Sequence, residues 1–163
     1  MKRIILTVAV LVFAFQFGTA QDEQITIGAH VGIPTGDASD VTTLNVGVDA
    51  SYYFLKDISE GLDIGLSTGY TMFMGDEDAG FDEDISYIPL AASARLGFSE
   101  NFFASADLGY ALSTDSDVAD GGFYYQPKFG YTFGALELAA FYKSISEDLV
   151  TVSSFGVGVG YRF

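Results

Sequence analysis

The chain has 163 residues, of which 22 are acidic, 7 are basic and none is cysteine, and its formal net charge at pH 7 is −15. This length fits one domain. The acidity argues against a nucleic-acid partner, because nucleic-acid binding requires basic surfaces. A chain without cysteine has no disulfide framework and no lipidated cysteine. Hydrophobic residues make up 49% of the chain, with 15 Phe and 10 Tyr, so an intrinsically disordered protein is excluded.

The first twenty residues have the pattern of a secretory signal peptide. Lys2 and Arg3 form a short positive region, an apolar run covers residues 4–17, and small residues follow up to Ala20, where a signal peptidase would cleave. The alternative is an amino-terminal membrane anchor, but the apolar run is short for a membrane helix. We therefore expect residues 1–20 to be a cleaved signal peptide and residues 21–163 to form the mature domain.

Beyond this segment, large apolar residues alternate with small or polar ones in eight stretches. A β-strand turns successive side chains to opposite faces, so each stretch predicts a strand with one apolar face. The predicted strands cover residues 24–34, 42–55, 62–74, 85–98, 102–113, 123–133, 136–145 and 151–163. No stretch after residue 20 is long and apolar enough to predict a membrane-spanning helix.

The connections between the predicted strands alternate in length. Residues 56–61, 99–101 and 134–135 form short turns, whereas residues 35–41, 75–84, 114–122 and 146–150 are mostly longer. Transmembrane β-barrels have short periplasmic turns and longer outer loops, and an even strand number lets the sheet close without an exposed edge. The sequence therefore predicts an all-β fold: an eight-stranded antiparallel up-and-down transmembrane β-barrel with both termini periplasmic and a lumen filled by side chains.

The polar faces of the predicted strands carry acids and bases in equal number. The acids are Asp49, Asp63, Asp107 and Glu137, the bases are Arg95, Lys128, Lys143 and Arg162, and His30, the single histidine, shares this face. Buried charges must be paired, whereas a solvated face of such an acidic chain needs no balance. We therefore expect a luminal ion-pair network, with the apolar faces turned toward lipid.

The height of each charged side chain above the periplasmic strand ends predicts its partner. The expected pairs are Glu137 with Arg162, Asp107 with Lys128 and His30 with Asp49, and Arg95 is expected between Asp63 and Asp107. Catalysis by His30 would need a nucleophile within reach. An interior structural role is the favoured interpretation of His30, and no catalytic residue is predicted.

Aromatic residues gather near the two ends of the predicted strands, as in the interfacial girdles of membrane proteins. The periplasmic set is Phe54, Phe98, Phe102, Phe133, Tyr161 and Phe163, and the outer set is Tyr70, Tyr110, Phe123, Tyr125 and Tyr142. An ordinary soluble core would not sort aromatic residues in this way. The pattern favours a membrane barrel, although the chain lacks the Trp that such girdles usually contain.

The four longer connections contain thirteen acidic residues and no basic residue. One interpretation is capture of Ca²⁺ or Mg²⁺ between these carboxylates and an anionic sugar-phosphate surface. The candidate metal ligands are Asp115, Asp117 and Asp120, although their spacing differs by one from a calcium loop and no Glu closes it. The favoured interpretation is a solvated, mutually repelling set of loops. Apart from such weak metal binding, we expect no cofactor.

The last nine residues alternate most strictly. Phe155, Val157, Val159, Tyr161 and Phe163 share one face, with glycines and one arginine between them. This pattern resembles the terminal strand that acts as the assembly signal of bacterial outer-membrane β-barrels. Residues 21–163 as a whole resemble small barrels of the OmpA-barrel and OmpX type and porin-family outer-membrane barrel domains. The resemblance implies a place in the Gram-negative cell envelope, with insertion by the barrel assembly machinery after periplasmic chaperoning, but no shared activity.

Three functions are compatible with these features. The first is a structural or surface-interaction barrel that sits in outer-membrane lipid and displays acidic extracellular loops to an unidentified partner. The second is a narrow porin-like channel for small ions or solutes, against which a filled lumen argues. The third is a barrel enzyme acting on lipid. The sequence favours the first and does not identify a surface ligand.

Overall fold

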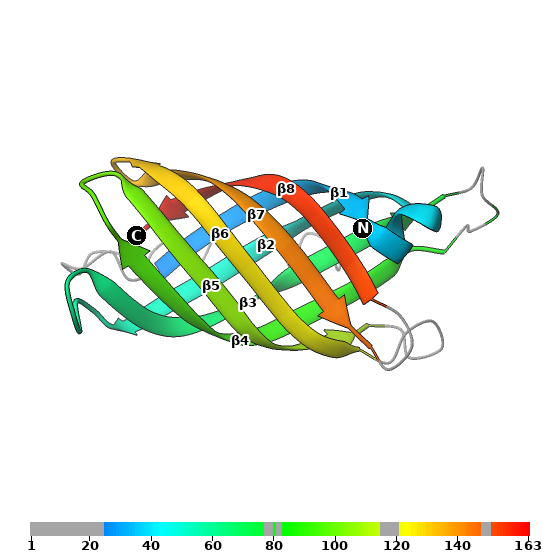
Figure 1. The fold of residues 1–163 in the computed structure, drawn as a ribbon, viewed down its shortest axis with the longest axis horizontal. Coiled ribbons are helices and arrows are strands. Elements are labelled where there is room, and N and C mark those ends of the chain that lie inside the picture. The colour runs from blue at the N-terminus through cyan, green and yellow to red at the C-terminus, as the bar shows by residue number, and fades with distance from the viewer. Residues whose placement is uncertain (1–24, 77–79, 81–82, 115–120, 148–150) are drawn as a thin grey trace, which may run out of the picture.

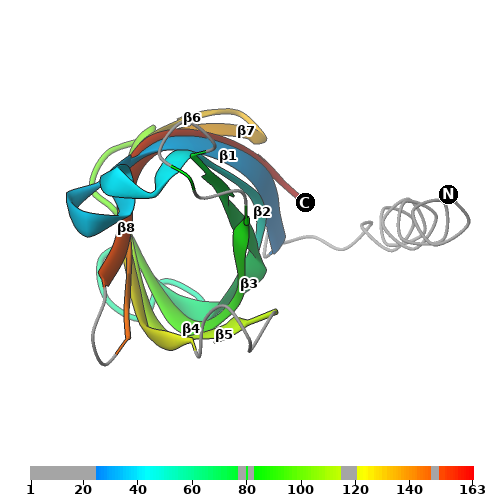
Figure 2. The ribbon, with the colours of Figure 1, turned by 90° about the vertical axis from the view of Figure 1, so that its right-hand side faces the viewer.

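A computed structural model of the chain describes residues 25–76, 80, 83–114, 121–147 and 151–163. Eight antiparallel strands follow one another around a closed barrel, in which each strand pairs with its neighbours in sequence and the last pairs with the first (Figures 1 and 2). The strands are β1 (Ile25–Thr35), β2 (Thr42–Leu55), β3 (Leu62–Gly75), β4 (Ile85–Gly97), β5 (Phe102–Ser113), β6 (Gly122–Phe133), β7 (Leu136–Ser146) and β8 (Thr151–Arg162). Every predicted strand is present, and each boundary lies within one residue of its prediction.

One short element was not predicted. The 3-10 helix η2 (Gly36–Asp40) occupies the first long connection, and Gly36 opens it with a φ of +64°, a conformation that glycine adopts without steric cost. The hydroxyl groups of Ser39 and Thr42 donate hydrogen bonds to the carbonyl oxygens of Gly36 and Ala38 at 2.7 and 2.6 Å. Within the described ranges, no helix is long and apolar enough to cross a membrane.

Strand β8 closes the barrel against β1. The register runs without a break from Thr26 opposite Arg162 to Thr35 opposite Ser153, and the Phe163 N–H donates to the Ile25 carbonyl oxygen at 2.8 Å. Closure pairs the backbone groups of both terminal strands, so the sheet has no open edge. The alternating carboxy-terminal segment is therefore built into the wall along its whole length.

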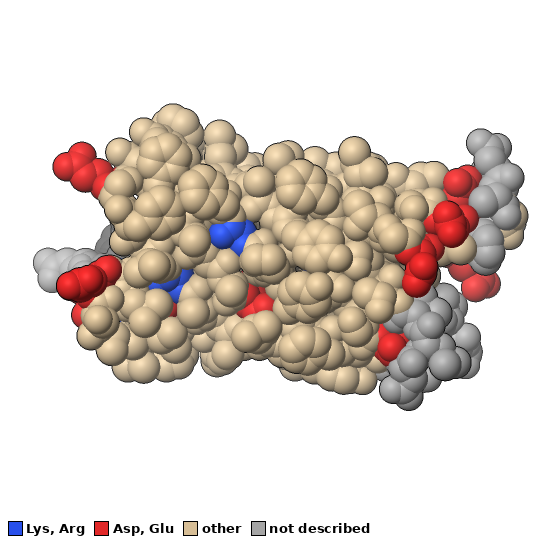
Figure 3. Space-filling model, viewed as in Figure 1, with Lys and Arg blue, Asp and Glu red and all other residues tan. Residues whose placement is uncertain are grey.

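The two ends of the barrel differ. The short turns and the end of β8 lie at one end, on the left of Figure 1, and η2 with the longer connections lies at the other. We call these the short-turn end and the long-loop end. Figure 3 shows acidic residues gathered at both ends and few charged residues on the wall between them.

The two faces of the wall have the predicted character. Outward side chains such as Val48, Leu66, Leu108 and Val157 are between 52% and 58% exposed, whereas the inward face carries the buried polar and charged residues. Outward aromatic rings contact one another near the short-turn end, as for Phe98 on Phe129 with centroids 5.6 Å apart. Exposing this wall to water would be unfavourable, because its apolar area is continuous around the barrel.

Candidate functional site

The lumen holds the candidate site residues in three levels. An ion-pair level lies near the short-turn end, a hydrogen-bonded level around His30 lies above it, and an apolar cluster fills the lumen toward the long-loop end. Strand alternation places these side chains inside, because residues of one parity along every strand face the lumen.

Glu137 is the centre of the ion-pair level. Arg95 on β4 binds it with two contacts, Nη2 to Oε1 at 2.7 Å and Nη1 to Oε2 at 3.0 Å, and Arg162 on β8 approaches Oε1 through Nε at 3.5 Å. The Arg95 guanidinium also lies 3.6 Å from the centroid of the Phe103 ring. The predicted contact of Glu137 with Arg162 is present, but the bidentate partner of Glu137 comes from across the lumen.

Arg95 on β4 lies between the strands that carry Asp63 and Asp107, as predicted, but its ion-pair partner is Glu137. Asp63 does lie opposite Arg95 in the register of β3 and β4, yet its Oδ1 accepts the Asp57 N–H in the exposed turn at 2.9 Å. Comparing the heights of charged residues on neighbouring strands does not reveal a contact between residues on opposite sides of the lumen. In an eight-stranded barrel the lumen is narrow enough for a long side chain to cross it.

The other two predicted pairs are present in the middle of the lumen. Lys128 Nζ lies 2.9 Å from Asp107 Oδ2, and His30 Nδ1 lies 2.6 Å from Asp49 Oδ2. Both pairs join adjacent strands, β5 to β6 and β1 to β2, where the hairpin register fixes the relative height. Lys143 was predicted to face the lumen without an assigned partner, and its Nζ lies 2.7 Å from His30 Nε2.

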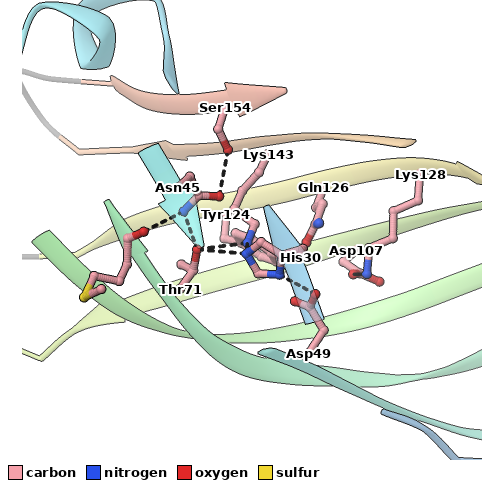
Figure 4. A network of polar contacts seen from close by, with 11 residues as sticks. His30, Asn45, Asp49, Thr71, Asp107, Tyr124, Gln126, Lys128, Lys143 and Ser154 are labelled. Carbon is pink, nitrogen blue, oxygen red and sulfur yellow. Dashed lines mark hydrogen bonds and ion pairs between the residues drawn. The ribbon is translucent and has the colours of Figure 1, made fainter. Parts of the chain in front are cut away.

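Neutral polar residues complete this level, and none of them was predicted to belong to a site. Lys143 Nζ donates to Thr71 Oγ1 at 3.0 Å, and Asn45 Nδ2 donates to the same oxygen at 2.8 Å (Figure 4). Ser154 donates to Asn45 Oδ1 at 3.0 Å, and the Tyr124 hydroxyl donates to Gln126 Oε1. Their inward positions in the strand alternation could have identified them as luminal residues, but charge pairing alone does not reveal them.

The apolar cluster was not predicted either. Its members are buried residues of strands β3 to β8 together with Ala38 of η2, namely Ala38, Phe73, Tyr87, Ala91, Ala111, Tyr124, Ile145 and Val152. The hydroxyl of Tyr87 donates to Glu147 Oε1 at 2.7 Å, which ties β4 to the connection after β7. The sequence does indicate this cluster, because Phe73, Ile145 and Val152 are apolar residues at inward positions of the strand alternation. The lumen near the long-loop end thus contains an apolar cluster beside buried polar residues such as Ser144 and Ser153.

A small polar cavity separates the first two levels. Its volume is about 70 Å³, and its lining includes His30, Asp49, Arg95, Lys128 and Glu137. This space suits a few water molecules, because one water occupies about 30 Å³ in the liquid. Pockets that take small organic ligands measure about 300–1,000 Å³. The lumen therefore has no room for an organic substrate at this position.

The remaining predicted residues lie elsewhere. Phe155, Val157, Val159 and Tyr161 face outward from β8 and are about half exposed, and Phe163 follows them. The candidate metal ligands Asp115, Asp117 and Asp120 lie outside the described residues. Among the residues that are described, no group of three or more His, Asp or Glu side chains is placed to hold a metal ion.

Proteins of known structure share this architecture. The outer membrane protein Ail of Yersinia pestis, in a phospholipid bilayer nanodisc, is 18% identical with a TM-score of 0.57, and the match covers 87% of this chain and 100% of Ail. The N-terminal β-barrel domain of Pseudomonas aeruginosa OprF is 16% identical with a TM-score of 0.55, covering 88% and 100%. The outer membrane enzyme PagL is 12% identical with a TM-score of 0.60, covering 85% and 99%.

This chain has the fold of the eight-stranded outer-membrane β-barrels. The resemblance in fold that the sequence predicted is therefore confirmed. Identities this low establish an architecture and not an activity, since one fold supports many functions. No protein-family model and no curated protein matches the chain.

Proposed function

We propose that the chain is an integral β-barrel of the bacterial outer membrane with a structural or surface-interaction role. The observation that carries this proposal is the inverted arrangement of side chains. Charged residues such as Arg95, Glu137 and Asp107 are buried and paired inside the barrel, while large apolar residues cover its outer wall. Such a wall is stable in hydrocarbon and costly in water, because apolar area exposed to water is unfavourable at about 25 cal/mol per Å².

The proposed orientation places the short-turn end in the periplasm and the acidic long-loop end outside the cell. Short periplasmic turns and longer outer loops are the rule in bacterial barrels. Described acids at the long-loop end include Asp37, Asp40, Asp76, Glu83 and Asp84. Export would follow removal of residues 1–20, and assembly would use the outward residues of β8 as the recognition signal.

The filled lumen supports a structural role over conduction. Buried side chains of the apolar cluster occupy the long-loop end, and the polar cavity below them measures only about 70 Å³. An ion that crossed this part of the lumen would have to shed its hydration among buried side chains, which is costly. We therefore propose that the folded barrel does not act as a porin.

The proposal also assigns no catalysis and no resident cofactor. PagL shows that this fold can carry an enzyme, but a hydrolase needs a nucleophile and a base that substrate can reach. His30 is only 6% exposed, and its ring nitrogens bind Asp49 and Lys143 inside the wall. Ail, the attachment invasion locus protein, is a barrel of the same fold whose name fits a surface role of the kind proposed here.

Cell fractionation with heat-modifiable gel mobility tests the proposal. The chain, expressed with its first twenty residues in a Gram-negative host, should enter the outer-membrane fraction and migrate faster unheated than boiled. A peptide tag inserted at Gly80 should be labelled on intact cells, and the matched tag at Gly134 only after the outer membrane is permeabilised. A soluble, detergent-independent protein would contradict the location, and discrete steps in planar-bilayer conductance would favour the channel instead.

A further inference from the structure

We propose that Asp49, His30 and Lys143 form an acid-sensitive latch across the lumen. In this latch a neutral His30 imidazole links a carboxylate on β2 to an ammonium group on β7. A second proton on His30 is incompatible with this link, so acid favours the unfolded chain, in which His30 is free to bind that proton. The proposal goes beyond the surface role and does not rest on it, because the purified barrel suffices to test it.

The two contacts of the imidazole assign its proton. Asp49 Oδ2 lies 2.6 Å from Nδ1, and an ionised carboxylate only accepts hydrogen bonds, so Nδ1 carries the hydrogen. Lys143 Nζ lies 2.7 Å from Nε2, and an ammonium group only donates, so Nε2 presents its lone pair. The ring is therefore neutral and satisfied on both sides, with the charges of Asp49 and Lys143 on either side of it (Figure 4).

A proton added at Nε2 has no acceptor. Thr71 Oγ1 lies 3.3 Å from Nε2, but it already accepts hydrogen bonds from Lys143 Nζ at 3.0 Å and from Asn45 Nδ2 at 2.8 Å. The added proton would also place an imidazolium against an ammonium group. One of the two cations must then move away, and the bond between β1 and β7 is lost.

The other groups around His30 do not relieve this conflict. Lys128 on β6 lines the same cavity as His30 and is a second cation, whose partner is Asp107 on β5 at 2.9 Å. Phe141 on β7 presents its ring 5.2 Å from the imidazole, and Gly158 lies opposite His30 on β8 without a side chain. Among the described groups facing His30, the anionic side chain is Asp49, which Nδ1 already binds.

The small cavity beside the latch extends toward the short-turn end. The polar cavity is lined by Thr26, Glu137 and Gly160 near the base of the barrel and by His30 and Asp49 at its other end. Toward the long-loop end, the apolar cluster fills the lumen.

The expected effect follows from proton linkage. In the unfolded chain a histidine has an ordinary pKa of about 6.5. In the folded barrel with the latch closed, His30 binds no second proton, so the unfolded state binds more protons and stability falls as the pH decreases below that value. Between pH 7.5 and pH 5.5, the folding equilibrium constant should fall about tenfold, which corresponds to about 1.4 kcal/mol.

Urea unfolding of the barrel in phospholipid vesicles, followed by circular dichroism at both pH values, measures this change. The variant His30→Gln keeps every carboxylate and should lack the tenfold fall. Lys143→Met removes the competing cation and should also reduce it, because protonated His30 can then pair with Asp49. The proposal would be overturned if the folding equilibrium constant of wild type fell, between the two pH values, by a factor less than three times the factor measured for His30→Gln.

Nitrogen-15 NMR of the wild-type imidazole decides the matter where the variants do not fold. The proposal expects a neutral ring with hydrogen on Nδ1 at pH 7.5 that stays neutral in the folded barrel at pH 5.5. Hydrogen on Nε2 at pH 7.5, or titration near pH 6.5 with the fold intact, would reject the latch.

Discussion

Replacing Glu137 by Gln should destabilise the barrel strongly. Glu137 and Arg95 are 6% and 8% exposed, and two contacts of 2.7 and 3.0 Å join them. The amide keeps one acceptor oxygen but loses the charge, so the Arg95 guanidinium stays buried against Phe103 without a counter-ion. Removing one partner of a buried ion pair typically costs about 3–5 kcal/mol. Domain stabilities are about 5–15 kcal/mol, so the loss is easily measured.

Urea unfolding in phospholipid vesicles measures this cost, with folded protein scored by gel mobility because the chain has no Trp. Two charge exchanges serve as matched controls. Exchanging Arg95 and Glu137 should recover most of the lost stability, whereas exchanging Glu137 and Arg162 should not, because an arginine at position 137 then faces Arg95. A cost below about 1 kcal/mol for Glu137→Gln, the size of an exposed ion pair, or equal recovery in both exchanges, would refute the reasoning.

Two further predictions use matched positions. At Gly156 of β8 an added Cβ would lie 2.2 Å from a backbone oxygen, whereas at Gly158 on the same face its nearest neighbour is 3.3 Å away. Gly156→Ala should therefore cost about 1–3 kcal/mol of stability, and Gly158→Ala should stay within about 1 kcal/mol of wild type. Equal shifts of the urea unfolding midpoint in the two variants would contradict this. Leu108→Lys on the outer wall should cost about 2–4 kcal/mol of stability in a bilayer, while Ile58→Lys in a short turn should change stability by less than about 0.5 kcal/mol. A tolerated lysine at position 108 would be inconsistent with lipid contact there.

The strands could be predicted from the sequence because a membrane barrel imposes one rule on every residue of its wall. Each outward position must be apolar and each inward position must fit the lumen, so the alternation extends over the full length of every strand. Pairs across one hairpin were also predictable, as for Asp107 with Lys128, because the turn fixes the register of adjacent strands.

Contacts across the lumen could not be predicted in this way. The pairing of Arg95 with Glu137 joins β4 to β7, and no single hairpin register relates these strands. The apolar cluster was missed for another reason. Phe73 and Ile145 stand near strand ends, where an inward apolar side chain is easily taken for an irregular end of the alternation rather than as part of a second core.

Depth-dependent quenching of a single introduced Trp tests the central claim that the apolar wall meets lipid and the charges face inward. Leu108 and Tyr124 suit this measurement, because Leu108 points outward beside Gly109, which lies opposite the inward-facing Tyr124. In vesicles of brominated phospholipid, the fluorescence of Leu108→Trp should be strongly quenched and that of Tyr124→Trp much less. Equal quenching at both positions, or a Trp at position 108 that aqueous iodide quenches instead, would contradict the account.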